Sequence, residues 1–482
     1  MTSTPKTPTA DNLNQVLTNI DENLQTSISR LMAFLKIPSI STDPAYKHDC
    51  RTAAQWLVDQ LNDLGFNASL RDTPGHPMVV AHYIVNDSTN ASGQHVPHIL
   101  FYGHYDVQPP EPLEEWNSPP FEPVIKTGKD GNERIFARGA SDDKGQLLTF
   151  IEAVRAMINA SFTLSLNMTL LFEGEEESGS PSLDAFLAEN TNELSHDVAL
   201  VCDTGMWDAQ TPAITTRLRG MVHEEITISG PDIDLHSGLY GGAAINPIRV
   251  LTKILGDLHD HNGKVTIEGF YDGVNELPDE TIAQWKKLDK AAHELLSDVG
   301  LEEPAGETGR TILEQVWSRP TLDVNGIWGG YIGAGTKTVI PAKASAKISF
   351  RLVGTQDPAK VLRGFRDFVS QRLPSDCTII FHSDDPASGG ASPALEISQD
   401  NSSLRQAAQA LEDEFGKKPV MMGCGGSIPI VGAFKDVLGM DSILVGFALS
   451  DDAIHSPNEK YDVNSFHKGI RSWARIIAAL GA

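Results

Sequence analysis

Apolar runs and helical patterns alternate along much of the chain. Helical periodicity is found at residues 16–35, 51–64, 147–158, 403–415 and 464–480, and apolar strand-like runs at 78–85, 98–107, 164–172, 198–202 and 442–449. Apolar strands separated by helices are typical of a mostly parallel sheet that is covered on both faces. We therefore predict an α/β domain, with residues 1–15 as a polar tail ahead of the first helix.

The pattern changes between residues 211 and 385. Strands are predicted at 222–229, 321–328, 344–352 and 378–382, helices at 247–260 and 358–373, and a polar insertion at 263–319. This β-α-β-β-α-β order is typical of a ferredoxin-like α+β unit. We therefore predict a discontinuous catalytic domain made of residues 1–210 and 386–482, with 211–385 inserted as a second domain.

Composition and charge exclude some classes of function. Among 482 residues, 38 are basic and 64 are acidic, which gives a net charge of −26 and opposes nucleic-acid binding. No apolar stretch approaches the length of a membrane span, and the N-terminal residues lack the pattern of a signal peptide. The four cysteines are scattered without CxxC spacing. We therefore expect a cytoplasmic protein with no nucleic-acid or membrane partner.

Four predicted strands lead directly into acidic or histidine residues, at the end where ligands of parallel α/β sheets bind. These strand ends and one helix start supply a candidate metal set: His104, Asp142, Glu177, Asp203 and His455. Imidazole and carboxylate ligands without sulfur suit Zn²⁺, with Mn²⁺ and Co²⁺ as alternatives. Five ligands exceed a four-coordinate site, and Asp142 is the expected bridge between two divalent ions that activate a water molecule.

Glu176 precedes the candidate ligand Glu177, and a carboxylate beside activated water can take its proton and pass it to the leaving amine. Asp106, two residues after His104, is expected to orient that imidazole. Each motif alone has a plainer interpretation: a charged loop at 175–177, a helix cap at Asp142 and a structural His-x-Asp pair. Their coincidence at successive strand ends favours a catalytic site.

Seven stretches carry a resemblance to a known family: Gly103–Val107, Arg138–Gly145, Glu173–Ser180, Asp203, Asp234–Gly238, Gly425–Pro429 and His455–Glu459. In this order they resemble the dizinc exopeptidase family of carnosinases, cytosolic non-specific dipeptidases, glutamate carboxypeptidases and acetylornithine deacetylases. The motifs span nearly the whole chain and are closest to the dipeptidase branch.

The resemblance implies roles for the candidate residues. One metal ion would be held by His104, Asp142 and Asp203, the other by Asp142, Glu177 and His455, with Glu176 as general base and acid. The inserted domain would be a lid that also forms the contact of a homodimer. His236, in that lid, would reach the active site of the partner subunit and stabilise the developing oxyanion.

Substrate recognition is also implied by the resemblance. The residues concerned are Arg351, Thr338 and Ser427 for the substrate carboxylate, Gly426 in the same turn as Ser427, and Asn325 for a carbonyl contact. An arginine fork suits a carboxylate because it donates two parallel hydrogen bonds. One departure is that many dipeptidase relatives have Arg-Glu where this chain has Gly423-Cys424.

The sequence therefore predicts a metallo-exopeptidase that cleaves dipeptides or short peptides with a free C-terminal carboxylate, through water activated between two metal ions. Deacylation of N-acyl amino acids needs the same machinery and is the first alternative. A non-catalytic metal-binding scaffold on the same fold is the second alternative, and the presence of Glu176 with all five candidate ligands opposes it.

Overall fold

The computed structural model describes residues 10–85, 95–297, 299–382, 391–398, 400–426 and 428–482. The chain forms two compact units: Met1–Thr216 with Ile397–Met422 and Ala433–Ala482, and Arg217–Glu396 with Gly423–Gly432. These boundaries differ from the predicted ones at residues 211–216, 386–396 and 423–432. Among the described residues, no helix combines the length and apolar character that crossing a membrane requires.

A mixed sheet forms the centre of the first unit. The strand order is β1-β2-β6-β3-β7-β17-β8-β15, with β16 paired to β8. The strands are β1 (Asn67–Arg71), β2 (Met78–Tyr83), β3 (His98–His104), β6 (Asn167–Glu173), β7 (Val198–Val201), β8 (Ala213–Leu218), β15 (Leu395–Glu396), β16 (Val420–Cys424) and β17 (Ser442–Leu444). The four central strands β6, β3, β7 and β17 are parallel to one another. The flanking strands are antiparallel: β2 pairs with β6 and with β1, and β8 pairs with β17. The predicted α/β class with a mostly parallel central sheet is confirmed.

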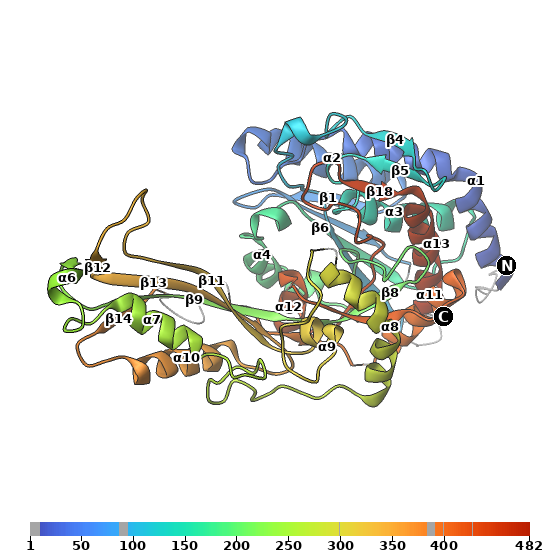
Figure 1. Ribbon diagram of the computed structural model, residues 1–482. Helices are drawn as coiled ribbons and strands as arrows, with labels where there is room; N and C mark the ends of the chain where they lie inside the picture. Colours follow the sequence, from blue (N-terminus) through green and yellow to red (C-terminus); the bar gives the residue numbers. More distant parts are fainter. Residues whose placement is uncertain (1–9, 86–94, 298, 383–390, 399, 427) are drawn as a thin grey trace, which may run out of the picture. The chain divides into compact units, whose positions relative to one another are not determined.

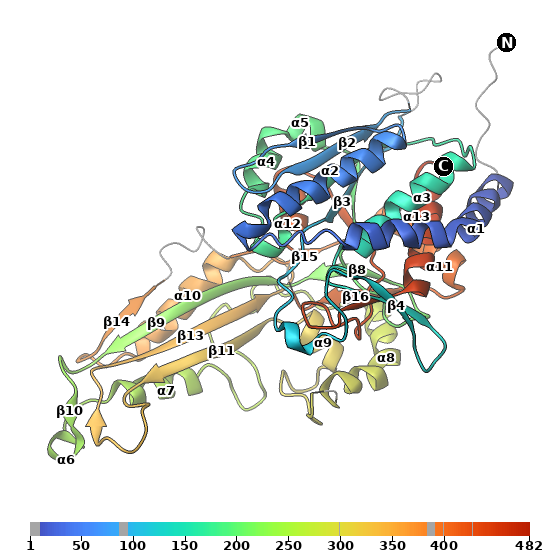
Figure 2. The ribbon, with the colours of Figure 1, turned by 90° about the horizontal axis from the view of Figure 1, so that it is seen from above.

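Helices cover this sheet. They are α1 (Ala10–Leu35), α2 (Lys47–Asp63), α3 (Lys144–Asn159), α4 (Leu183–Glu189), α5 (Thr191–Leu194), α11 (Ser402–Phe415) and α13 (Val463–Leu480), with short 3-10 turns η1 (Pro44–Tyr46), η2 (Leu113–Glu115) and η3 (Glu176–Ser178). Helices α1, α3, α11 and α13 pack side by side (Figure 2). Between α3 and the sheet, Phe101 stacks on Phe150 at 3.7 Å and meets Trp473 edge-on. This aromatic contact anchors the helix that follows Asp142.

A small sheet, β18-β5-β4, completes the first unit. Its strands are β4 (Val124–Thr127), β5 (Glu133–Phe136) and β18 (Lys460–Asp462). Since β18 follows the loop of His455 and β5 precedes the loop of Asp142, the antiparallel β18–β5 pairing brings these two loops to the same end of the sheet.

The second unit contains a four-stranded antiparallel sheet of order β11-β13-β9-β14. The strands are β9 (Gly220–Ser229), β11 (Thr321–Gly329), β13 (Lys343–Leu352) and β14 (Thr378–Phe381). Helices α7 (Pro247–Gly256) and α10 (Pro358–Arg372) lie along one face (Figure 1). Alternate residues such as Ile226, Ile228, Ile348 and Phe350 are buried beneath them. The period of two thus gives this sheet one apolar face and one polar face.

Further elements of the second unit are β10 (Leu235–His236), which pairs with β12 (Val339–Ile340), and the helices α6 (Ser237–Tyr240), α8 (Asp279–Ser297) and α9 (Ile312–Trp317). Helix α12 (Pro429–Asp436) spans the boundary between the units. The predicted polar insertion at 263–319 therefore contains two helices. The start of α9 had a readable signal, since Thr311 and Glu314 form a capping box.

Two other boundaries differ from the predictions. Helix α1 already begins at Ala10, so the predicted tail is wrong for residues 10–15. Strand β17 ends at Leu444 rather than at residue 449, although the residues that follow are buried. An apolar run predicts buried residues, but it does not predict where the hydrogen bonds between neighbouring strands end.

Candidate metal centre

Adjacent parallel strands position the first group of candidate ligands. His104 is the last residue of β3, and Asp203 follows the end of β7, which is paired with β3. His104 is fully buried, and its Nε2 lies 3.0 Å from Asp142 Oδ1 and 3.9 Å from Asp203 Oδ2. The three residues can hold one metal ion between them.

Asp142 also faces a second imidazole. Its other oxygen, Oδ2, lies 3.0 Å from His455 Nε2, which in turn lies 3.2 Å from Glu177 Oε2. Asp142, Glu177 and His455 therefore form a second candidate group. One carboxylate directs each of its oxygens to a different group, which is the geometry that a bridging ligand requires.

The plainer interpretation of the Ser-Asp-Asp stretch, a helix cap, is not what the structure has. Asp143 occupies the N-cap position of α3 and makes no capping hydrogen bond with its side chain. Its Oδ2 instead accepts the backbone N–H of His104 at 3.1 Å. Both aspartates of this stretch are thus directed to the candidate centre.

Asp106 contacts both His104 and the turn that carries Glu176 and Glu177. Its backbone carbonyl lies 3.2 Å from His104 Nδ1, and its carboxylate accepts the backbone N–H groups of Glu176 and Glu177 at 3.3 and 3.0 Å. Because Nδ1 is engaged with Asp106, Nε2 is the nitrogen left to face Asp142. The turn η3 is held by the same side chain.

Burial raises the pKa of Glu176 to about 8, and Asp203 and Glu177 add to the effect. Burial also raises the pKa of Asp203 to about 7, with a contribution from Asp142. Both groups therefore hold a proton more tightly than an exposed acid does.

The two imidazoles respond to the carboxylates around them. Hydrogen bonds that the His455 imidazole donates to Asp142 and Glu177 raise its pKa to about 10. Burial lowers the pKa of His104, but Asp106 and Asp142 outweigh burial and raise it well above the usual range. The carboxylates around both imidazoles therefore favour their protonated form.

The donor set suits two divalent ions. Two imidazole nitrogens and three carboxylates, divided into two groups that share Asp142, match the nitrogen and oxygen ligands of zinc-type sites. A third acidic group, Asp451, Asp452 and Asp462, differs because Lys460 Nζ lies 2.7–3.1 Å from an oxygen of each. An ammonium group already contacts all three carboxylates of that cluster.

The residues predicted to bind substrate lie in the second unit, at different places. His236 is exposed, its Nδ1 accepts the N–H of Gly238 at 3.0 Å, and Ser237 N–H donates to the carbonyl of Thr338 at 3.1 Å. The structure thus brings His236 and Thr338 together. Since Nδ1 accepts, the proton is on Nε2, which is free to donate.

Arg351 lies near the other end of β13, opposite Met221 and Thr321. Lys343, where β13 begins, is close to Thr338 in sequence, and eight residues of strand separate it from Arg351, a length of about 26 Å. A dipeptide spans only about 7 Å. Within one chain, His236 and Arg351 therefore do not reach the same dipeptide.

The other substrate candidates are placed as follows. Asn325 lies at a β-bulge of β11, where the register shifts between Val324 and Gly326. Gly426 lies in the turn after β16, and Ser427 lies outside the described residues.

Arg219, which the sequence did not single out, donates from Nε to the carbonyl of Gly425 at 3.0 Å. Burial and the nearby Arg351 lower the pKa of Arg219 to about 10.

The sequence departure at Gly423 has a local explanation, because a Cβ there would lie 2.4 Å from Trp317 Cβ.

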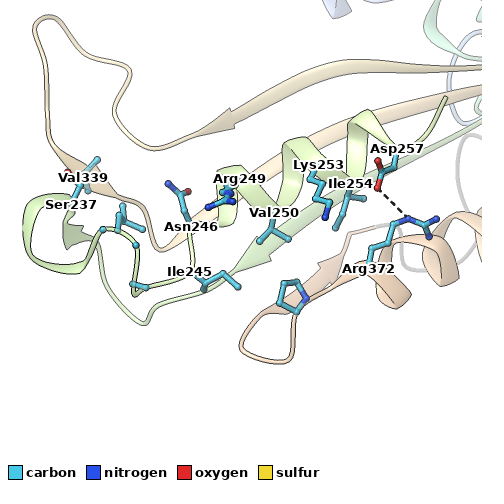
Figure 3. A pocket seen from close by; sticks show the side chains of 15 residues that line it. Ser237, Ile245, Asn246, Arg249, Val250, Lys253, Ile254, Asp257, Val339 and Arg372 are labelled. Atoms are coloured by element: carbon cyan, nitrogen blue, oxygen red, sulfur yellow. Dashed lines mark ion pairs between the residues drawn. The ribbon is translucent and has the colours of Figure 1, made fainter. Parts of the chain in front are cut away.

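A cavity of about 700 Å³ lies in the second unit, between α7, β12 and the end of α10 (Figure 3). Its lining includes Ser237, Arg249, Lys253 and Arg372, the last of which lies 3.9 Å from Asp257. None of its lining residues belongs to the two candidate metal groups. The cavity is therefore distinct from the metal centre.

Comparisons with known proteins agree with this geometry. The model of peptidase family M20/M25/M40 matches residues 100–479. The Cys-Gly metallodipeptidase DUG1 of Candida albicans is 32% identical over 95% of this chain and 96% of its own length, and the human Beta-Ala-His dipeptidase is 29% identical over 98% and 94%. Among solved structures, the M20 family metallo-carboxypeptidase Sso-CP2 of Sulfolobus solfataricus is 32% identical with a TM-score of 0.76, over 94% of this chain and 99% of its own. The dipeptidase Dug1p of Saccharomyces cerevisiae is 29% identical with a TM-score of 0.74, over 97% of this chain and 98% of its own.

Proposed function

The chain belongs to peptidase family M20/M25/M40, and from that premise we propose that it hydrolyses dipeptides or short peptides with a free C-terminal carboxylate. The observation that carries the proposal is Asp142, whose two oxygens each lie 3.0 Å from a different candidate imidazole. The names of the full-length relatives, metallodipeptidases and Beta-Ala-His dipeptidases, support peptides over N-acyl amino acids as substrates.

We propose two Zn²⁺ ions as the cofactors, one with His104, Asp142 and Asp203 and one with Asp142, Glu177 and His455. The donor set supports zinc, with Mn²⁺ or Co²⁺ able to use the same ligands. When bound, such a pair of ions polarises the scissile carbonyl and makes water more acidic.

The chain itself supplies proton transfer. In the proposal, Glu176 takes a proton from the attacking water and passes it to the leaving amine, so that one peptide bond and one water become a carboxylic acid, which then ionises, and an amine. The two backbone hydrogen bonds from Glu176 and Glu177 to Asp106 support this role because they fix the start of the turn that carries both glutamates.

We further propose a homodimer in which the inserted unit acts as lid and His236 serves the active site of the partner subunit. His236 pairs with β12, which precedes the start of β13, whereas Arg351 lies near the end of β13. This separation supports the arrangement, because a short peptide cannot contact both residues within one chain. Nε2–H of His236 would then stabilise the oxyanion, while Arg351 of the other subunit binds the substrate carboxylate.

Exposed apolar side chains of the inserted unit support an intersubunit contact there. They are Ile233, Leu239, Tyr240, Val324, Ile327, Trp328, Tyr331 and Ile332. A concentration of exposed apolar residues in one unit is typical of a protein–protein interface. None of the four cysteines, all of which lie in the described part of the chain, forms a disulfide, which supports the proposed location in the reducing cytoplasm.

Release of free amino acids from a panel of dipeptides and N-acetyl amino acids tests the function. The purified protein is assayed with added Zn²⁺ or Mn²⁺ beside Glu176→Gln. We expect dipeptide cleavage by the wild type, and a loss of about 10²–10⁴-fold in the variant with metal content unchanged. Cleavage of acetylated substrates alone would make the protein a deacylase, and metal binding without any turnover would make it a scaffold.

A further inference from the structure

The two candidate metal groups differ in how their histidines are supported. His104 and Asp203 stand at the ends of paired buried strands. His455 lies in the loop between β17 and β18, its side chain is 53% exposed, and its φ of 62° is in the left-handed region. The position of His455 relative to Asp142 therefore depends on what joins their two loops.

Glu459 joins these loops. Its fully buried carboxylate accepts the backbone N–H groups of Ser141 and Asp142 on Oε1, at 2.9 and 3.0 Å, and that of Gly139 on Oε2, at 2.9 Å. Arg138 Nη1 donates to Oε2 at 2.7 Å. One side chain from the loop of His455 thus binds three backbone groups of the loop that carries Asp142.

A second link lies beside the first. Asp452, also fully buried, accepts Ser141 Oγ at 2.7 Å and the N–H of Leu449 at 2.8 Å on Oδ2. Lys460 Nζ neutralises its other oxygen at 2.7 Å. The base of the His455 loop is therefore closed and attached to the residue that precedes Asp142.

We propose that Glu459 is a positioning residue that holds Asp142 and His455 at the separation the second metal ion requires. Its carboxylate has no donor hydrogen, so both oxygens can accept, and Arg138 compensates its charge in the protein interior. A glutamine would have one accepting oxygen, and its NH₂ group would face backbone N–H donors. The loop of Asp142 would then shift relative to His455, while the ligands placed by strands stay.

The affected quantity is the affinity for the second ion. Groups that orient metal ligands typically change metal affinity by about 10–100-fold when they are replaced. Glu459→Gln is therefore expected to keep one tightly bound Zn²⁺ and to bind the second about 10–100-fold more weakly. kcat is expected to fall and to recover as free Zn²⁺ is raised.

Equilibrium dialysis against buffered Zn²⁺, with folding checked by circular dichroism, measures this. The matched control is Glu414→Gln, which removes another buried carboxylate, bound by Lys468, Arg471 and Arg475. The control is expected to lower thermal stability and to bind two ions with wild-type affinity. Wild-type affinity for both ions in Glu459→Gln, or equal weakening in Glu414→Gln, would overturn the proposal.

A milder variant keeps the test decisive if Glu459→Gln does not fold. Glu459→Asp keeps the negative charge beside Arg138 but shortens the side chain by one methylene group, so that it loses part of its contact with the three N–H groups. This variant is expected to bind the second ion several-fold more weakly, and unchanged affinity would contradict the proposal. The inference rests on the proposed two-metal function, but its readout is zinc affinity. A wild-type protein that binds two ions and cleaves no peptide would refute the proposed function and leave the Glu459 result interpretable.

Discussion

The backbone N–H of Glu177 donates a hydrogen bond to the carboxylate of Asp106 over 3.0 Å. Glu176 donates to the same carboxylate, and the carbonyl of Asp106 lies 3.2 Å from His104 Nδ1. One residue thus connects the imidazole of the first metal group to the turn that carries the proposed general base. A substitution of Asp106 should therefore affect both the His104 imidazole and the turn with Glu176.

Asp106→Asn is expected to lower kcat/KM by about 10–100-fold, because the amide can present only one oxygen to two N–H donors. The measurement is kcat/KM on a dipeptide at saturating metal, with zinc affinity determined in parallel. Asp59→Asn, at an exposed position of α2, is the control and should behave as wild type. Full activity in Asp106→Asn would show that the turn with Glu176 and Glu177 keeps its conformation without the Asp106 carboxylate.

Metal removal is expected to abolish peptide hydrolysis reversibly. Dialysis against a chelator should give an inactive, folded protein, and activity should return with two equivalents of Zn²⁺, Mn²⁺ or Co²⁺ per chain. Because His455 is protonated in the metal-free site, metal binding should release protons and weaken as pH falls. Turnover that survives complete metal removal would contradict the two-metal proposal.

The metal-free protein should lose stability as pH rises. The pKa of His455 is raised to about 10 by Asp142 and Glu177, so its contribution is complete below about 6.5 and is lost as pH rises through 10. The pKa values of Glu176 and Asp203 are raised to about 8 and 7, so these groups also lower stability as pH rises, over a lower pH range than His455 does.

Thermal melts of the chelated protein between pH 6.5 and 10 check this expectation. The melting temperature should fall over that range, and the fall should be smaller in His455→Asn, which removes the most basic of the three groups. If the melting temperature falls equally with pH in the wild type and in His455→Asn, His455 does not hold its proton in the folded protein.

Cross-subunit action of His236 predicts complementation. His236→Ala and Arg351→Ala should each be nearly inactive, whereas a refolded equal mixture should regain about a quarter of wild-type activity, since half of the dimers are mixed and each mixed dimer has one intact site. Activity after mixing and size-exclusion chromatography are the measurements. If the mixture stays inactive while dimers form, His236 does not serve the partner.

The sequence by itself determined the α/β class and the identity of the five residues that come together in the two candidate groups. Apolar runs ending in acids and histidines are local patterns, and parallel pairing brings the ends of β3, β6 and β7 to one edge of the sheet. Adjacent placement of Glu176 and Glu177 was likewise visible in the chain, because neighbouring residues of a turn are necessarily close.

Only the tertiary structure decided the contacts between distant segments. Glu459 and Gly139 are 320 residues apart. No local sequence pattern indicates that the Glu459 carboxylate binds the loop that contains Gly139 and Asp142. The separation of His236 from Arg351 likewise follows from strand length and register, which depend on pairing across the sheet. Residue types and spacing select the chemistry, whereas packing and long-range hydrogen bonds determine where each group stands.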